Sequence, residues 1–291
     1  SASMICALVT TFIWGTAFIA QDTGMDNIGP LTFNSARFFV GFLTILPIAL
    51  IFEKKKIGLE ISSKSKVFYK YLLFMGISLF LGTFLQQAAL QYTNIANAAF
   101  FTVFYVPLVP VLLFLIYSNK VHWSIWPSIG LCIFGVYLLS DFSNSEIMLG
   151  DSLVILCSVF WALHIIFAGK FMEIFDIPMF YAALQALFVA TLSLLFSYLF
   201  EEINFSNILL ESSSIIYAGV LSGGIAFTLQ MFAQKNIEET PAAIIYSLEG
   251  VFAAIAGWII LDQFLNLSNI FGCFLILIAV IFSQLSPSSK N

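Results

Sequence analysis

Ten long apolar segments, joined by short polar connections, occupy almost the whole chain and constrain its fold more than any other feature. They cover residues 4–20, 31–52, 68–91, 97–117, 124–141, 150–168, 178–200, 213–234, 240–261 and 268–286. A bilayer core about 30 Å thick requires roughly 20 apolar residues per crossing helix. Hydrophobic residues make up 60% of the 291-residue sequence and charged residues only 9%, too apolar for a soluble domain. The sequence therefore predicts an all-α integral membrane protein with ten transmembrane helices.

The charges of the connections predict how these helices cross the membrane. An N-terminus in the cytoplasm places every lysine on the cytoplasmic side: Lys54, Lys55, Lys56, Lys64, Lys66, Lys70, Lys120, Lys170, Lys235 and Lys290. The opposite connections carry acids and no lysine: Asp22, Asp26, Asp141, Glu146, Asp151, Glu201, Glu202, Glu211 and Asp262. Because cytoplasmic loops are enriched in lysine and arginine, we predict cytoplasmic N- and C-termini in a multi-pass protein of the cell inner (plasma) membrane.

The two halves of the chain repeat each other weakly. Trp14 in FIWGTAFIAQ matches Trp161 in VFWALHIIFAG, 147 positions later, and Arg37 matches Gln185, 148 positions later. The stretch NIANAAFF matches EETPAAII, 144 positions later. Each half would hold five helices, an odd number, so the second copy must cross the membrane in the opposite sense. We therefore predict two inverted repeats, residues 1–142 and 147–288, around a central cavity, as is typical of secondary transporters.

Six stretches in this order resemble the EamA family of the drug/metabolite transporter (DMT) superfamily. They are Trp14–Gln21, Pro30–Gly41, Asn94–Leu112, Phe160–Lys170, Gly219–Ala243 and Tyr246–Trp258. The resemblance implies a ten-helix bundle whose central cavity is lined by helices of both repeats, with the fifth and tenth helices at the periphery. It also implies transport of small metabolites, often outward.

The sequence departs from the family pattern at three places. The family usually has Glu-Pro where this chain has Glu249-Gly250. It often has Gly-Glu at the ends of the fourth and ninth helices, where this chain reads YSNK (Tyr117–Lys120) and LDQF (Leu261–Phe264). We expect these changes to affect helix termination or gating, and Gly250 to give a looser hinge than proline would.

Two charged residues lie deep inside predicted transmembrane helices, away from their ends. Glu249 lies near the bilayer midplane, where a charge costs at least about 2.5–3.5 kcal/mol, and Arg37 lies at a similar depth in the second helix. In one interpretation Glu249 binds a substrate amine or takes up a proton, and Arg37 recognises a carboxylate. In the other, the two form a buried structural ion pair.

Seven further residues are candidates for substrate binding: Trp14, Asn34, Tyr105, Trp161, His164, Gln185 and Tyr246. The paired tryptophans can stack on a substrate or hold a cation through the ring face. Tyr105 precedes Glu249 by 144 positions, and His164 shares a helix face with Trp161. Ordinary packing explains each of them as an alternative. Other intramembrane polar groups, Gln86 and Gln230 among them, are interpreted as bonding across helices.

The residues favour a secondary transporter for a small polar or amphipathic metabolite, with export or exchange as the candidate modes and amino acids or related zwitterions as favoured substrates. An amine or quaternary-ammonium transporter is an alternative within the same fold, and a membrane receptor or channel-like binding protein is an alternative class. Recognised catalytic motifs are absent from the sequence, and we predict neither enzyme activity nor a cofactor or metal. Expected partners are the substrate and the lipid bilayer, with a proton as the candidate coupling ion; no nucleic acid is expected, and the protein would be a monomer or homodimer.

Overall fold

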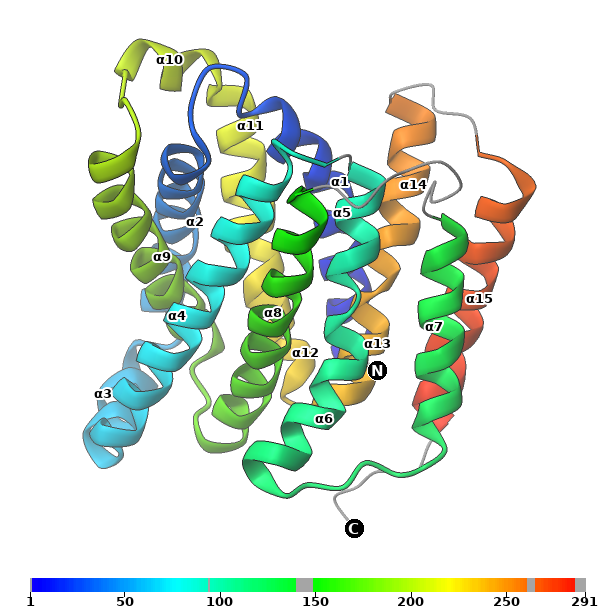
Figure 1. The fold of residues 1–291 in the computed structure, drawn as a ribbon. Coiled ribbons are helices and arrows are strands. Elements are labelled where there is room, and N and C mark those ends of the chain that lie inside the picture. The colour runs from blue at the N-terminus through cyan, green and yellow to red at the C-terminus, as the bar shows by residue number, and fades with distance from the viewer. Residues whose placement is uncertain (1, 94, 140–148, 261–264, 286–291) are drawn as a thin grey trace.

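The computed structural model describes residues 2–93, 95–139, 149–260 and 265–285, and their regular secondary structure is helical (Figure 1). The elements of the first half are α1 (Ala2–Thr23), α2 (Pro30–Phe52), α3 (Lys54–Ser63), α4 (Ser65–Ala89), α5 (Ile95–Thr102), α6 (Tyr105–Tyr117) and α7 (Ile125–Leu139). Those of the second half are α8 (Leu149–Ile174), α9 (Pro178–Phe200), α10 (Phe205–Leu210), α11 (Ser212–Tyr217), η2 (Ala218–Ala226), α12 (Phe227–Gln234), α13 (Glu239–Tyr246), α14 (Leu248–Ile260) and α15 (Leu267–Leu285). The predicted all-α fold class is confirmed.

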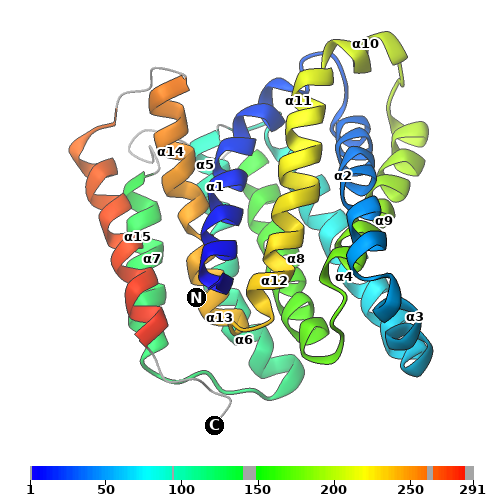
Figure 2. The ribbon, with the colours of Figure 1, turned by 180° about the vertical axis from the view of Figure 1, so that it is seen from behind.

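In the described ranges, nine helical segments are long and apolar enough to cross a membrane. Three of them are composite: α5 continues into α6, α11 continues through η2 into α12, and α13 continues into α14. The tenth predicted crossing corresponds to α7, an apolar helix with 15 described residues. The chain is therefore a multi-pass membrane protein, and α1 begins at the end of the bundle where α15 ends (Figures 1 and 2).

The helices pack in pairs that relate the two halves. Helix α2 packs along α9, and α7 packs along α15 at the edge of the bundle, where the fifth and tenth helices were expected (Figure 2). Helix α4 packs against α8, just as η2 and α12 pack against α1. Helices α5 and α6 also pack against α8, just as α13 and α14 pack against α1. Each contact thus has a counterpart in which the two halves exchange roles.

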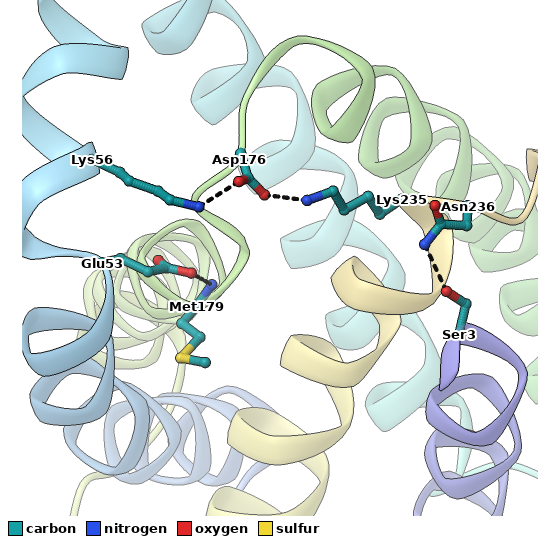
Figure 3. Close-up of polar contacts among 7 residues, drawn as sticks. All are labelled: Ser3, Glu53, Lys56, Asp176, Met179, Lys235 and Asn236. Atoms are coloured by element: carbon teal, nitrogen blue, oxygen red, sulfur yellow. Dashed lines mark hydrogen bonds and ion pairs between the residues drawn. The ribbon is translucent and has the colours of Figure 1, made fainter. Parts of the chain in front are cut away.

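Two carboxylates cap the antiparallel pair α2 and α9 at opposite ends. Glu53, at the end of α2, accepts a hydrogen bond from the backbone N–H of Met179 in the first turn of α9 (3.0 Å; Figure 3). Glu201, at the end of α9, accepts hydrogen bonds from the backbone N–H groups of Leu31 and Thr32 in the first turn of α2 (both 2.8 Å). The first N–H groups of a helix have no partner within it, and the helix dipole favours a negative charge there. Each helix of the pair therefore stabilises the start of the other.

Glycines bring α2 and η2 into close contact. A Cβ on Gly41 would lie 2.8 Å from the carbonyl carbon of Gly223, and a Cβ on Gly219 would lie 2.7 Å from the carbonyl oxygen of Arg37. Any larger side chain would push these helices apart. Gly219 and Gly223, which form a GxxxG pattern in the eighth crossing, thus serve a contact within the chain.

Charged residues distinguish the two ends of the bundle. At the end that carries α3, here called the lysine-rich end, Asp176 pairs with both Lys56 and Lys235 (Figure 3). The end that carries α10, here called the acidic end, has no lysine among its described residues, and Asn27 there donates a hydrogen bond to Glu211 (2.6 Å). Helices α3 and α10 lie at opposite ends of the bundle, as the ten-helix arrangement predicts (Figure 1). Which end faces the cytoplasm stays a prediction.

Helix α6 ends at Tyr117, at the start of the stretch where the sequence departs from the family pattern. Ser118 caps it in the left-handed conformation, with φ of 58°, a conformation that glycine adopts more readily. The corresponding departure at the end of the ninth crossing, Leu261–Phe264, lies outside the described residues.

Candidate functional site

A central cavity of about 30 Å³ lies between helices of both halves. Its lining residues are Trp14, Phe18, Gln21, Arg37, Thr83, Gln86, Thr102, Tyr105, Trp161, Ile165, Ser222, Phe227, Gln230, Tyr246 and Glu249. One buried water needs roughly 10–15 Å³ measured in this way. The cavity in this conformation therefore has room for about two waters, and a metabolite would require it to expand.

Breaks in two helices bring polar side chains to the cavity. Helix α5 ends at Thr102 and α6 begins at Tyr105. Helix α13 ends at Tyr246 and α14 begins at Leu248, so Glu249 lies in its first turn. Interrupted helices are common where transporters bind substrates, because a break exposes polar backbone and re-aims side chains. The two breaks lie 144 positions apart in sequence, at equivalent places of the two halves.

Glu249 is the carboxylate of this cavity. Its side chain is buried, and its Oε1 atom accepts a hydrogen bond from the Tyr105 hydroxyl group at 3.4 Å. Across the described residues, no ion pair joins Glu249 to a lysine, arginine or histidine. The carboxylate is thus held by a single long hydrogen bond and remains available to a ligand or a proton.

Arg37 lines the same cavity without an acidic partner among the described residues. Its Nε atom donates a hydrogen bond to Asn34 Oδ1 (2.8 Å), and its guanidinium carbon lies 4.9 Å from the centroid of the Phe38 ring. Such a ring face stabilises a cation while leaving the terminal N–H groups free to bind a carboxylate. The alternative of a direct structural pair between Arg37 and Glu249 does not occur in this conformation.

Aromatic rings form one wall of the cavity. The ring centroid of Trp14 lies 6.3 Å from that of Trp161, 5.2 Å from that of Phe227 and 5.5 Å from that of Tyr246. Phe227 also stacks on Trp161, with an angle of 9° between the rings. The two tryptophans that match between the halves therefore meet at the centre of the bundle.

Six of the nine residues proposed from the sequence line this cavity: Trp14, Arg37, Tyr105, Trp161, Tyr246 and Glu249. The other three lie beside it. Asn34 orients Arg37, while His164 Nε2 hydrogen-bonds to Gln185 Oε1 at 3.0 Å, with both side chains fully buried. The expected shared face of His164 and Trp161 is confirmed by their rings, whose centroids lie 6.2 Å apart.

Several lining residues were not identified from the sequence, and Phe227 is the most central of them. Gln86 and Gln230 were assigned to bonding between helices. Gln86 does donate to Thr102 Oγ1 (3.0 Å), and it also lines the cavity. The repeat offers a signal for these positions, because the 144-residue spacing that relates Tyr105 to Glu249 also relates Gln86 to Gln230.

The described part of the chain offers no group of three or more histidine, cysteine, aspartate or glutamate residues that could hold a metal ion. The four cysteines are free thiols. The chemistry of the cavity therefore rests on one carboxylate, one guanidinium, amide and hydroxyl groups, and aromatic faces.

Comparison with known proteins identifies a family. The model of the EamA-like transporter family matches residues 1–141 and again residues 148–285. An uncharacterized transporter of Archaeoglobus fulgidus (strain ATCC 49558 / DSM 4304 / JCM 9628 / NBRC 100126 / VC-16) is 31% identical over 287 residues, which cover 98% of this chain and 86% of that protein. The uncharacterized transporter YoaV of Bacillus subtilis (strain 168) is 22% identical, covering 99% and 98%. A protein crystal structure with 15% sequence identity has a TM-score of 0.76 and covers 97% of this chain and 96% of that one, which shows a shared fold.

Proposed function

Because the chain belongs to the EamA-like transporter family and is a membrane transporter, we propose that it moves a small polar metabolite by alternating access, without ATP hydrolysis. The observation that carries this proposal is the central cavity, to which one half contributes Arg37 and the other contributes Glu249. The two charges do not neutralise each other, so a substrate can engage both.

The proposed mechanism requires two inverted repeats, residues 1–142 and 147–288. The double match to the family model and the reciprocal helix contacts support this division. Two halves with one fold and opposite orientation can exchange conformations, which opens the cavity to alternate sides of the membrane. We propose that the lysine-rich end faces the cytoplasm, in the inner membrane of the cell.

The favoured substrate is an amino acid or a related zwitterion. The planar guanidinium of Arg37 suits a carboxylate, and the carboxylate of Glu249 suits an ammonium group. The substrate would leave by export or exchange, and protonation of Glu249 would provide the coupling step in a proton-driven cycle.

A second candidate substrate class is an amine or quaternary ammonium ion. Trp14, Trp161 and Tyr246 favour it, because aromatic faces attract cations by roughly 0.5–2 kcal/mol. Arg37 argues against it, since a buried guanidinium repels a purely cationic ligand.

Counterflow into proteoliposomes tests the proposal. Vesicles loaded with an unlabelled amino acid should accumulate the same labelled amino acid, and the rate should saturate with concentration. Glu249→Gln should reduce the initial rate at least tenfold, whereas Glu202→Gln, the same change at an exposed acid, should not. A pore or a protein that only binds would give no counterflow, and normal counterflow by Glu249→Gln would refute the role of this carboxylate.

A further inference from the structure

Three fully buried polar side chains, each with an unpaired atom, lie at or beside the central cavity: Gln230 lines it, whereas His164 and Gln185 do not. They are His164 on α8, Gln185 on α9 and Gln230 on α12, and each is 0% exposed. His164 Nδ1, Gln185 Nε2 and Gln230 Oε1 have no hydrogen-bonding partner among the described residues. Buried polar atoms are nearly always paired, and an unpaired one costs free energy. Three such atoms on three adjoining helices call for an explanation in the function of the protein.

The three residues lie on the side of the cavity toward the lysine-rich end, and Gln230 is part of the cavity wall there. Along α8 and α12, His164 and Gln230 come one turn after Trp161 and Phe227, and both helices run toward that end (Figure 1). The Phe227 ring contacts both the cavity residue Trp14 and His164: its centroid lies 5.2 Å from that of Trp14 and 5.7 Å from that of the imidazole.

The other half of the molecule shows what these positions do when they are open to the cavity. Gln185 occupies the place of Arg37, and Gln230 the place of Gln86, in the two repeats. Arg37 and Gln86 both line the cavity; of their counterparts, Gln230 lines it and Gln185 does not. If the halves exchange conformations, Gln185 becomes exposed to the cavity as Arg37 is now.

We propose that His164 and Gln185, together with Gln230 of the cavity wall, form a second polar binding site, which receives the substrate when the Phe227 ring moves and the lysine-rich end opens. This inference rests on the proposed function and extends it to the second half of the cycle. With Gln185 Oε1 as acceptor, His164 Nε2 carries the proton. The site then offers Gln185 Nε2 as a donor, with His164 Nδ1 and Gln230 Oε1 as acceptors.

The chemistry of the second site differs from that of the cavity. It is built from two amides and an imidazole, so it suits a ligand that both donates and accepts hydrogen bonds, such as an α-amino acid. Because it lacks the full charges of Arg37 and Glu249, it holds a zwitterion less tightly. Such a site favours release of the substrate toward the lysine-rich end.

Contacts at the lysine-rich end keep the second site closed. Asp176, in the turn between α8 and α9, pairs with Lys56 of α3 and with Lys235 at the end of α12 (Figure 3). Lys170 of α8 pairs with Glu239 of α13 at 3.3 Å. Because Gln185 and Gln230 lie on α9 and α12, separation of these helices would break the Asp176 contacts and hydrate the site.

Cysteine accessibility from each side of the membrane tests the second site. A cysteine at Gln185 should react with a membrane-impermeant maleimide added at the lysine-rich end. Ser193→Cys is the matched control, because Ser193 lies two turns along the same helix, is 0% exposed and also has an unpaired oxygen. We expect the Gln185 cysteine to react at least tenfold faster than the Ser193 cysteine, and faster again with Asp176→Asn or Phe227→Ala. The parent protein, with its four native thiols, sets the background.

Equal rates of maleimide reaction at the Gln185 and Ser193 cysteines would overturn the inference, if they are found in the otherwise unchanged protein and also with Asp176→Asn and with Phe227→Ala. If Gln185→Cys does not fold, Gln230→Cys gives the same test from α12, with the same expected sidedness. Counterflow of the unsubstituted protein separates the two hypotheses. Counterflow with an unreactive Gln185 cysteine rejects the second site alone, and a lack of counterflow rejects the proposed function.

Discussion

The two halves of the molecule are alike where they build the fold and different where they line the cavity. Glu53 and Glu201, 148 positions apart, cap the same pair of helices in the same way. In contrast, Arg37 of the first half has Gln185 as its counterpart, and Glu249 of the second half has Tyr105. Each half thus contributes one charge and keeps a neutral group at the equivalent place. Shared residues indicate structure, and divergent residues indicate what the protein recognises.

The largest expected effect follows from removing the charge of the first half. Arg37→Gln makes that position identical to its counterpart, and it should reduce counterflow of an amino acid at least tenfold, because a charge-assisted hydrogen bond contributes about 1.5–3 kcal/mol. Lys54→Gln, at an exposed lysine of α3, is the matched control and should transport normally. Equal counterflow rates for Arg37→Gln and Lys54→Gln would show that the difference between Arg37 and its counterpart Gln185 has no role in substrate recognition.

Glu53 and Glu201, the carboxylates at equivalent places in the two halves, should affect the stability of the fold and not the recognition of the substrate. We expect Glu53→Gln and Glu201→Gln each to lower the free energy of unfolding by about 1–2 kcal/mol, since each removes a charged cap from a helix start. Thermal unfolding in detergent measures both variants. A loss from only one of them would show that the two caps are not equivalent.

A substitution at Tyr105, the neutral counterpart of Glu249, tests how much its hydrogen bond contributes to the role of that carboxylate. Its hydroxyl group lies 3.4 Å from Glu249, a long hydrogen bond, so Tyr105→Phe should lower counterflow only about threefold. A loss as large as that of Glu249→Gln would mean that the tyrosine binds substrate directly.

The smallest effect concerns pH at the lysine-rich end. Hydrogen bonds from Lys235 and Lys56 hold the pKa of Asp176 below its usual range. A lowered pKa in the folded state means that Asp176 stabilises the fold above its unfolded pKa of about 3.9, and that this contribution disappears as the pH falls through the folded value. The difference in unfolding temperature between the wild type and Asp176→Asn should therefore be constant from pH 8 to pH 5, begin to shrink near pH 4, and vanish only below the lowered pKa of the folded state. A difference that disappears near pH 6 would contradict the ion-pair assignment.

The sequence predicted the membrane-crossing segments well, because the length and apolarity of a segment must match the thickness and apolarity of the bilayer core. It also identified Trp14 with Trp161 and Tyr105 with Glu249, because an offset between repeats survives when individual motifs are weak. It did not predict that His164 and Gln185 face each other and not the cavity, because the rotation of a helix depends on its neighbours. Phe227 escaped notice because it is one of 33 phenylalanines, and lipid-facing and cavity-facing rings look the same in a sequence.

Breaks in the helices were equally hard to predict. The hinge of the ninth crossing was expected at Gly250, but α13 ends at Tyr246 and α14 begins at Leu248. Neither this break nor the π-helix η2 is marked by a proline. Both depend on packing between segments far apart in the chain, such as the contact of η2 with Gly41.

Ligand binding to matched compounds tests most directly whether the charges of the two halves act together. Thermal unfolding of the purified protein should be measured with leucine, with 3-methylbutylamine, which lacks the carboxylate, and with 4-methylpentanoate, which lacks the amine. A ligand that binds the folded state raises the unfolding temperature. We predict that leucine stabilises the wild type more than either analogue, and that Arg37→Gln removes its advantage over the amine. Equal stabilisation of the wild type by leucine and the amine, or an unchanged advantage in Arg37→Gln, would contradict a cavity that reads both ends of a zwitterion.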